Sequence, residues 1–73
     1  MEIYKTEDGK AIVTVERNVT RKQAISVANR YFKVKKSRLH CTQGYTKGND
    51  LFFEPEKGMT MVWAVWTEKE GDK

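Results

Sequence analysis

Several residue types are scarce in this chain of 73 residues, which has one cysteine, one histidine and one proline. Cys41 has no second cysteine to pair with, so an intramolecular disulfide is excluded and a reducing, cytoplasmic setting is expected. One Cys and one His also fall short of the ligand set of a zinc site, so we expect no metal and no cofactor. No stretch reaches the apolar length of a signal peptide or a membrane span, so we expect no contact with a membrane.

Acidic residues are absent from the middle of the chain. Residues 17–49 contain no Asp or Glu, whereas nine of the fourteen Lys and Arg residues fall there. Such segregation creates a local positive potential that attracts an anionic partner and that salt screens. The alternative interpretation is a basic face that contacts only solvent, because charge alone does not define a partner.

The length limits the chain to a single domain. A domain of this size buries only roughly 60% of the surface of its unfolded chain, which leaves little room for a deep catalytic cavity. We expect residues 1–67 to form the domain and the charged residues 68–73 to form a disordered tail.

A helix is predicted over residues 20–33. The Thr20 hydroxyl is suited to cap the first turn, and Gln23, three residues later, completes a capping box. Apolar residues at helical spacing gather on one side, and the opposite side is cationic. The apolar stripe consists of Ala24, Ile25, Val27, Ala28, Tyr31 and Phe32.

β-Forming residues predict strands on both sides of this helix. Residues 1–17 should form a hairpin around a turn at Gly9, with Ala11, Val13 and Val15 facing the core. After the helix we expect a strand over residues 34–43, a loop over 44–49, a short strand over 51–54, a turn over 54–58 and a final strand over 59–67. The final strand is apolar on both faces, which is typical of a central strand.

The fold class is therefore α+β, with one amphipathic helix on one face of a four- or five-stranded, mostly antiparallel sheet in the order ββαβββ. The opening hairpin with its turn at Gly9 and Lys10, the helix just past residue 20 and the long last strand resemble the β-grasp layout of ubiquitin-like and immunoglobulin-binding domains. The sequence ends in Gly-Asp-Lys and lacks the Gly-Gly terminus of conjugated or sulfur-carrier members, so the resemblance implies neither activity. A helix on a meander, similar to cystatin or PepSY domains, is the alternative.

One helix covers one face of a sheet, which leaves the other face open. We expect His40, Phe52 and Trp66 near that open face, where they would bind a protein or stack on unpaired bases. A homodimer through this face would bury the same rings. The alternative is that the twist and loops of the small sheet bury them.

No catalytic site is predicted. His40 and Cys41 are adjacent, but neighbours in a strand point to opposite faces, so they do not form a nucleophile and base pair. Residues 44–48 have the composition of a phosphate cradle, yet they lack the P-loop spacing and precede a strand. We therefore expect a binding module and not an enzyme.

Basic residues on the predicted helix and the following strand give the strongest functional indication, because they would neutralise successive phosphates of a nucleic acid. The leading hypothesis is a nucleic-acid-binding module without strong sequence preference. The alternative is a protein-binding domain, such as an inhibitor, adaptor or subunit, that uses the open sheet face or meets an acidic protein surface. The candidate contacts are Lys22, Arg30, Lys33, Lys35, Lys36 and Arg38.

Overall fold

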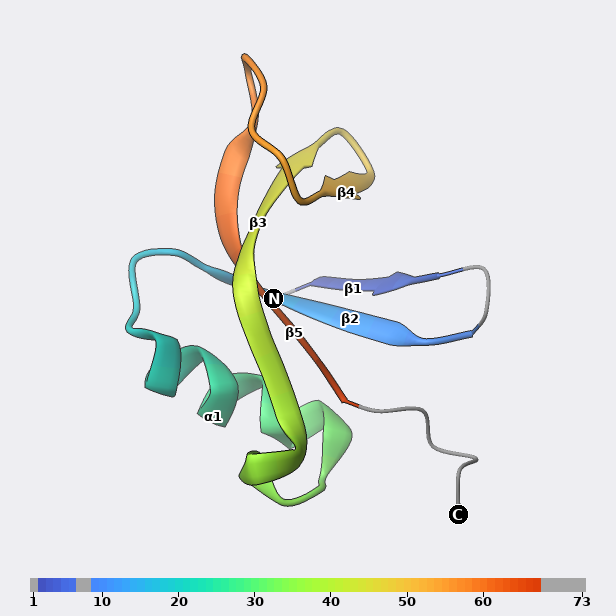
Figure 1. Cartoon of the computed structure of the whole chain (residues 1–73), viewed down its shortest axis with the longest axis vertical. Coiled ribbons are helices and arrows are strands. Elements are labelled where there is room, and N and C mark those ends of the chain that lie inside the picture. The colour runs from blue at the N-terminus through green and yellow to red at the C-terminus, as the bar shows by residue number, and fades with distance from the viewer. Residues whose placement is uncertain (1, 7–8, 68–73) are drawn as a thin grey trace.

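One helix lies against a curled, five-stranded sheet in the computed structural model, which describes residues 2–6 and 9–67 (Figure 1). The α+β class and the order ββαβββ are as predicted, whereas the tail expected over residues 68–73 lies outside the described residues. Neither helix of the described part is long and apolar enough to cross a membrane. The elements are β1 (Glu2–Lys5), β2 (Ala11–Glu16), α1 (Arg21–Phe32), the 3₁₀ helix η1 (Lys36–Arg38), β3 (Leu39–Lys47), β4 (Asp50–Phe52) and β5 (Thr60–Thr67).

The strands lie in the order β1-β2-β5-β3-β4, and every neighbouring pair is antiparallel. The last strand, β5, is therefore in the centre, where Val65 lies between Val13 of β2 and Cys41 of β3. This position confirms the prediction made from its two apolar faces. Because β2 and β3 both run antiparallel to β5, they run parallel to each other, and α1 connects them.

Helix α1 begins and ends with side-chain hydrogen bonds. Thr20 Oγ1 accepts from the Gln23 backbone N–H at 3.1 Å, and Gln23 Oε1 accepts from the Thr20 N–H at 3.0 Å, which is the predicted capping box. At the other end, Lys33 has φ 57° and donates its N–H to the Asn29 carbonyl. Asn29 Oδ1 then accepts from the Val34 N–H at 3.2 Å, so the chain leaves the helix in a fixed direction.

Small residues bring α1 close to the sheet. Ala24 and Ala28 are fully buried, as are Val13 and Val65 beneath the helix. Helix α1 contacts β2, β5 and β3, and it does so along the predicted apolar side except at Tyr31, which is 40% exposed. The buried core cluster consists of Val13, Val15, Ala24, Ala28, Leu39, Cys41 and Val65.

The face of the sheet away from α1 is also buried at its centre. Ile12, Thr14 and Ala64 lie on that face and are at most 8% exposed. The sheet curls so that β4 approaches β1 and β2, and Ile12 lines one hollow with Leu51 and Phe52 (Figure 1). The centre of this face is therefore covered, as in the alternative in which the twist and loops of the small sheet bury it.

Two boundaries around β3 differ from the prediction. Residues 36–38, predicted as strand, form η1, and residues 44–47, predicted as loop, extend β3. The extension lets β3 pair with β5 from Leu39 opposite Thr67 to Thr46 opposite Thr60. The turn itself is made at Gly48, whose φ of 64° favours glycine. Tertiary pairing thus determined the length of this strand.

Candidate functional site

The cations of α1 lie on the side turned away from the sheet. Lys22, Ser26, Arg30 and Lys33 follow one another at intervals of three or four residues, which places them on one side of a helix. Ala24 and Ala28, on the opposite side, are buried, whereas all four of these residues are exposed. The predicted cationic side of the helix is therefore confirmed.

Helix η1 folds back onto this row. Lys36 Nζ donates to Ser26 Oγ at 3.0 Å, although the two residues are ten positions apart. The contact places the Lys36 ammonium group next to the middle of α1, on the same side as Lys22 and Arg30. The six predicted cations are all exposed, and together we call them the cationic surface: Lys22, Arg30, Lys33, Lys35, Lys36 and Arg38.

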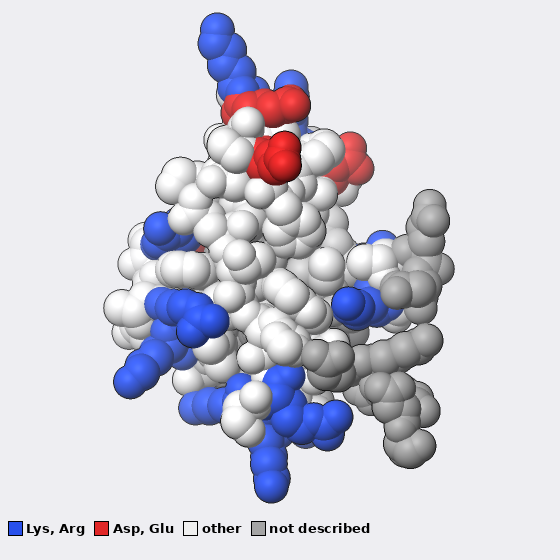
Figure 2. Space-filling view, in the orientation of Figure 1, with Lys and Arg blue, Asp and Glu red and all other residues white. Residues whose placement is uncertain are grey.

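Opposite charges are partly separated in the molecule. Figure 2 shows Lys and Arg side chains gathered around α1 and η1, whereas at the other end Asp and Glu side chains lie next to further Lys or Arg side chains. Within residues 2–6 and 9–67, none of the six cations of the cationic surface has an ion-pair partner. The acids of the described part are Glu2, Glu16, Asp50, Glu54 and Glu56.

Two of the cations on α1 oppose the helix dipole. Arg21 and Lys22 occupy the first turn, which contains no acid, and cations at that end cost about 0.3–1 kcal/mol each. Arg21 has a structural contact, because its Nη2 donates to the Cys41 carbonyl at 3.2 Å. Lys22 has no such contact within the described residues, so local stability does not explain its charge.

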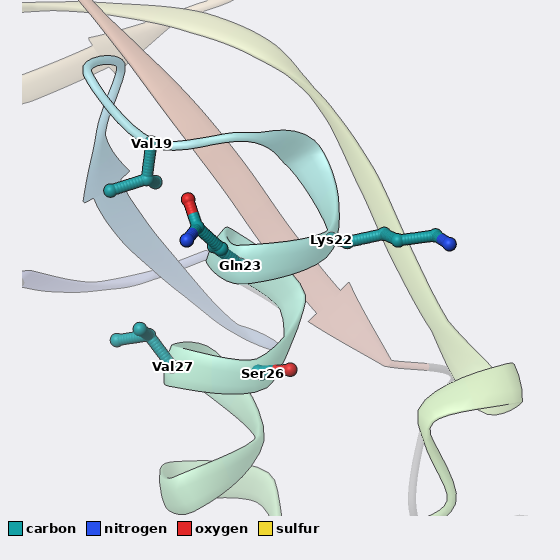
Figure 3. A pocket seen from close by; sticks show the side chains of 5 residues that line it. All are labelled: Val19, Lys22, Gln23, Ser26 and Val27. Atoms are coloured by element: carbon teal, nitrogen blue, oxygen red, sulfur yellow. The ribbon is translucent and has the colours of Figure 1, made fainter.

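A shallow hollow of about 360 Å³ adjoins the cationic surface (Figure 3). Val19 and Val27 point to one side of it, Lys22 and Ser26 lie on the other, and the Gln23 amide lies between them. Sequence reasoning missed this hollow, because Val19 precedes the helix and only the folded chain brings it near Val27.

A polar network holds the chain in place beside the hollow. Trp63 Nε1 donates to the Val19 carbonyl at 2.9 Å, and the Arg17 guanidinium lies 4.3 Å from the Trp63 ring centroid. Arg17 also donates to Gln43 Oε1 through Nε and Nη2, at 3.2 and 3.0 Å. Arg17 thus stabilises the fold, although it belongs to the basic segment.

The structure does not bring His40, Phe52 and Trp66 onto one surface. His40 stacks on Trp66 with ring centroids 5.5 Å apart, and both lie on the face away from α1. Phe52 is paired with Tyr45, five residues further along β3 than His40. The common interface expected for these three residues is therefore not one contiguous patch of side chains.

A different set of apolar side chains surrounds Phe52. Tyr45 of β3 lies opposite both Phe52 of β4 and Met61 of β5, so the three form a row across the sheet. Phe52 is 39% exposed and Met61 is 46% exposed. We call Phe52, Tyr45 and Met61 the apolar row. Only the register of the strands identifies it, and the sequence alone does not supply that register.

His40 and Cys41 point to opposite faces, as predicted. Cys41 is a free, buried cysteine of the core cluster, whereas His40 is exposed. Burial raises the pKa of the Cys41 thiol, and the nearby Arg21 charge lowers it by a smaller amount. The thiol therefore stays protonated at neutral pH and is a poor nucleophile.

The raised thiol pKa predicts a pH dependence of stability. The folded state binds the thiol proton more tightly than the unfolded state, so Cys41 contributes stability fully below the unfolded pKa of about 8.5, and this contribution is lost as the pH rises through the folded pKa. Urea unfolding between pH 7 and pH 10 should show a steeper loss for the native protein than for Cys41→Ala. An equal loss of stability in the two proteins would contradict the raised pKa of the Cys41 thiol.

Neither a metal site in the described residues nor a similar known protein indicates the function. Among the residues that the structure describes, no group of three His, Cys, Asp or Glu side chains is placed to hold a metal ion. No family model matches the chain, and no curated protein or solved structure matches it. Functional inference therefore rests on the surfaces themselves.

Proposed function

We propose that this chain is a non-catalytic module that binds the backbone of nucleic acids through the cationic surface. The observation that carries the proposal is the continuous row of cations on α1 and η1, joined by the contact between Lys36 and Ser26 and lacking ion-pair partners in the described part of the chain. The proposal includes the reducing, cytoplasmic setting that suits the free thiol of Cys41.

The dimensions of α1 fit this role. Lys22 and Lys33 are separated by eleven residues, which is roughly 16 Å along a helix axis. Phosphates of one strand follow each other every 3.4 Å or so along the axis of a duplex and wind around it, so the row is long enough to reach more than one of them. A row of this length favours an extended polyanion over a single small anion.

The absence of neighbouring acids supports the same partner. A cation that already has an acidic neighbour gains little from a phosphate, because the new contact replaces an old one. Here each contact releases a counterion from the nucleic acid, and the released counterion provides the driving force. The backbone is the same for every sequence, so we expect little sequence preference.

The salt dependence of binding tests the proposal. With about four to six phosphates engaged, the logarithm of affinity should fall with the logarithm of salt concentration with a slope of roughly −4 to −5 on duplex, and roughly −3 to −4 on single strands. Fluorescence anisotropy with labelled DNA and RNA would measure these slopes. An affinity that does not change with salt would rule out the proposed contacts.

A second candidate function is docking to another protein through the apolar row. Its support is the exposure of Phe52 and Met61, since large apolar side chains at a sheet surface are typical of interface cores. The two functions make different predictions for a charge reversal on η1, which would weaken nucleic-acid binding and leave docking through the apolar row unchanged.

A further inference from the structure

The hollow beside the cationic surface has two chemically different halves. Lys22 and Ser26 supply donors on one side, and Val19 and Val27 supply apolar surface on the other (Figure 3). A phosphate alone would use only the first half. A ligand that carries both an anion and a flat apolar group would use both.

The polar half has a hydroxyl and an ammonium group side by side. Ser26 Oγ accepts a hydrogen bond from Lys36 Nζ at 3.0 Å, so the hydroxyl hydrogen of Ser26 points elsewhere and is free to donate to an incoming oxygen. Lys22 lies one turn before Ser26 on the same side of the helix. The Ser26 hydroxyl and the Lys36 ammonium group therefore form one polar spot at the edge of the hollow, whereas Figure 3 shows the Lys22 side chain extending away from Ser26.

The apolar half is fixed in place and has one donor. Val19 is held by the hydrogen bond from Trp63 to its carbonyl, and Val27 belongs to α1. Gln23 Oε1 accepts a hydrogen bond from the Thr20 N–H in the capping box, so the Nε2 group of the same amide points the other way and can donate to a ligand. An apolar surface with a side-chain amide donor at its centre suits the face and edge of a nucleobase.

We infer that this hollow is a subsite for one unpaired nucleotide of a single-stranded nucleic acid, with its phosphate on Ser26 and Lys36, its base over Val19 and Val27, and Lys22 beside the next phosphate. The inference rests on the proposed function and adds to it a preference for single strands over duplex. Bases of a duplex are paired and stacked, so a duplex offers the hollow only its backbone. Single strands should therefore bind more tightly than duplex of the same length.

Methyl, side-chain amide and backbone amide NMR spectra of the full chain test this assignment. A short single-stranded DNA or RNA should shift the methyl signals of Val19 and Val27 and the Nε2 signals of Gln23, because a base ring lies over them. Inorganic phosphate should shift only signals of Ser26 and Lys36. The matched variant Ser26→Ala, at an exposed helical position, should weaken binding of the single strand roughly three- to tenfold.

The outcomes separate the two proposals. Binding of the single strand with shifts on the cationic surface but none at Val19, Val27 or Gln23 would overturn the nucleotide subsite and leave backbone binding in place. Equal affinity for single strand and duplex would overturn it as well. A protein that binds neither probe would overturn the proposed function, and the subsite with it.

Discussion

Trp63→Ala is expected to lower the free energy of unfolding by about 3 kcal/mol, the lower end of the range for loss of a large aromatic side chain. The ring packs against the core cluster, donates to the Val19 carbonyl and supports the Arg17 guanidinium. A chain of this length has roughly 4–11 kcal/mol of stability, so the loss is a large fraction of the total. Urea denaturation followed by circular dichroism would measure it.

Trp66→Ala is the matched control for this variant. Trp66 is also half-buried, but it stacks on the exposed His40 and is not part of the core contacts of Trp63. Its replacement should cost about 1 kcal/mol. Equal losses for the two tryptophans would show that the Trp63 network does not hold the β2–α1 connection.

The double charge reversal Lys33→Glu/Lys36→Glu is expected to lower the affinity for nucleic acid roughly a hundredfold at low salt. Two favourable phosphate contacts are lost, and two carboxylates now repel the backbone. Both residues are exposed, and the one hydrogen bond lost is that between Lys36 and Ser26 on the surface, so the fold should be retained. Anisotropy titrations would give the affinities, and circular dichroism would confirm folding.

Lys5→Glu/Lys57→Glu provides a control with the same change in net charge. Both lysines are exposed and lie outside α1 and η1, at the end of β1 and in the loop before β5. We expect the affinity of this control for nucleic acid to fall less than about threefold, because the overall positive potential of the protein is weaker. If the affinity of the control fell as much as that of Lys33→Glu/Lys36→Glu, net charge alone would drive binding.

The sequence predicted α1 well because its signals are local. Thr20 and Gln23 formed the expected capping box, and spacing alone separated the buried Ala24 and Ala28 from the cationic row. Three of the six proposed phosphate contacts, Lys22, Arg30 and Lys33, lie on α1 or at its C-cap, and the helix fixes the side that each of them occupies.

The parts that sequence reasoning missed depend on contacts between distant residues. Pairing with β5 extended β3 past Gly44, and curling of the sheet covered the centre of the face that was expected to be open. The same register placed Phe52 opposite Tyr45 and away from His40. The hydrogen bond between Lys36 and Ser26 arose because residues 36–38 form η1 where a strand was expected.

The most direct test of the cationic surface is the salt slope of single-strand binding in three proteins: the native chain, Lys33→Glu/Lys36→Glu and Lys5→Glu/Lys57→Glu. Each phosphate contact contributes about −0.7 to this slope, so the loss of two contacts should make the slope shallower by roughly 1.4 in the first variant and leave it unchanged in the second. Slopes that are the same in all three proteins would contradict the claim that the cations of α1 and η1 contact phosphates.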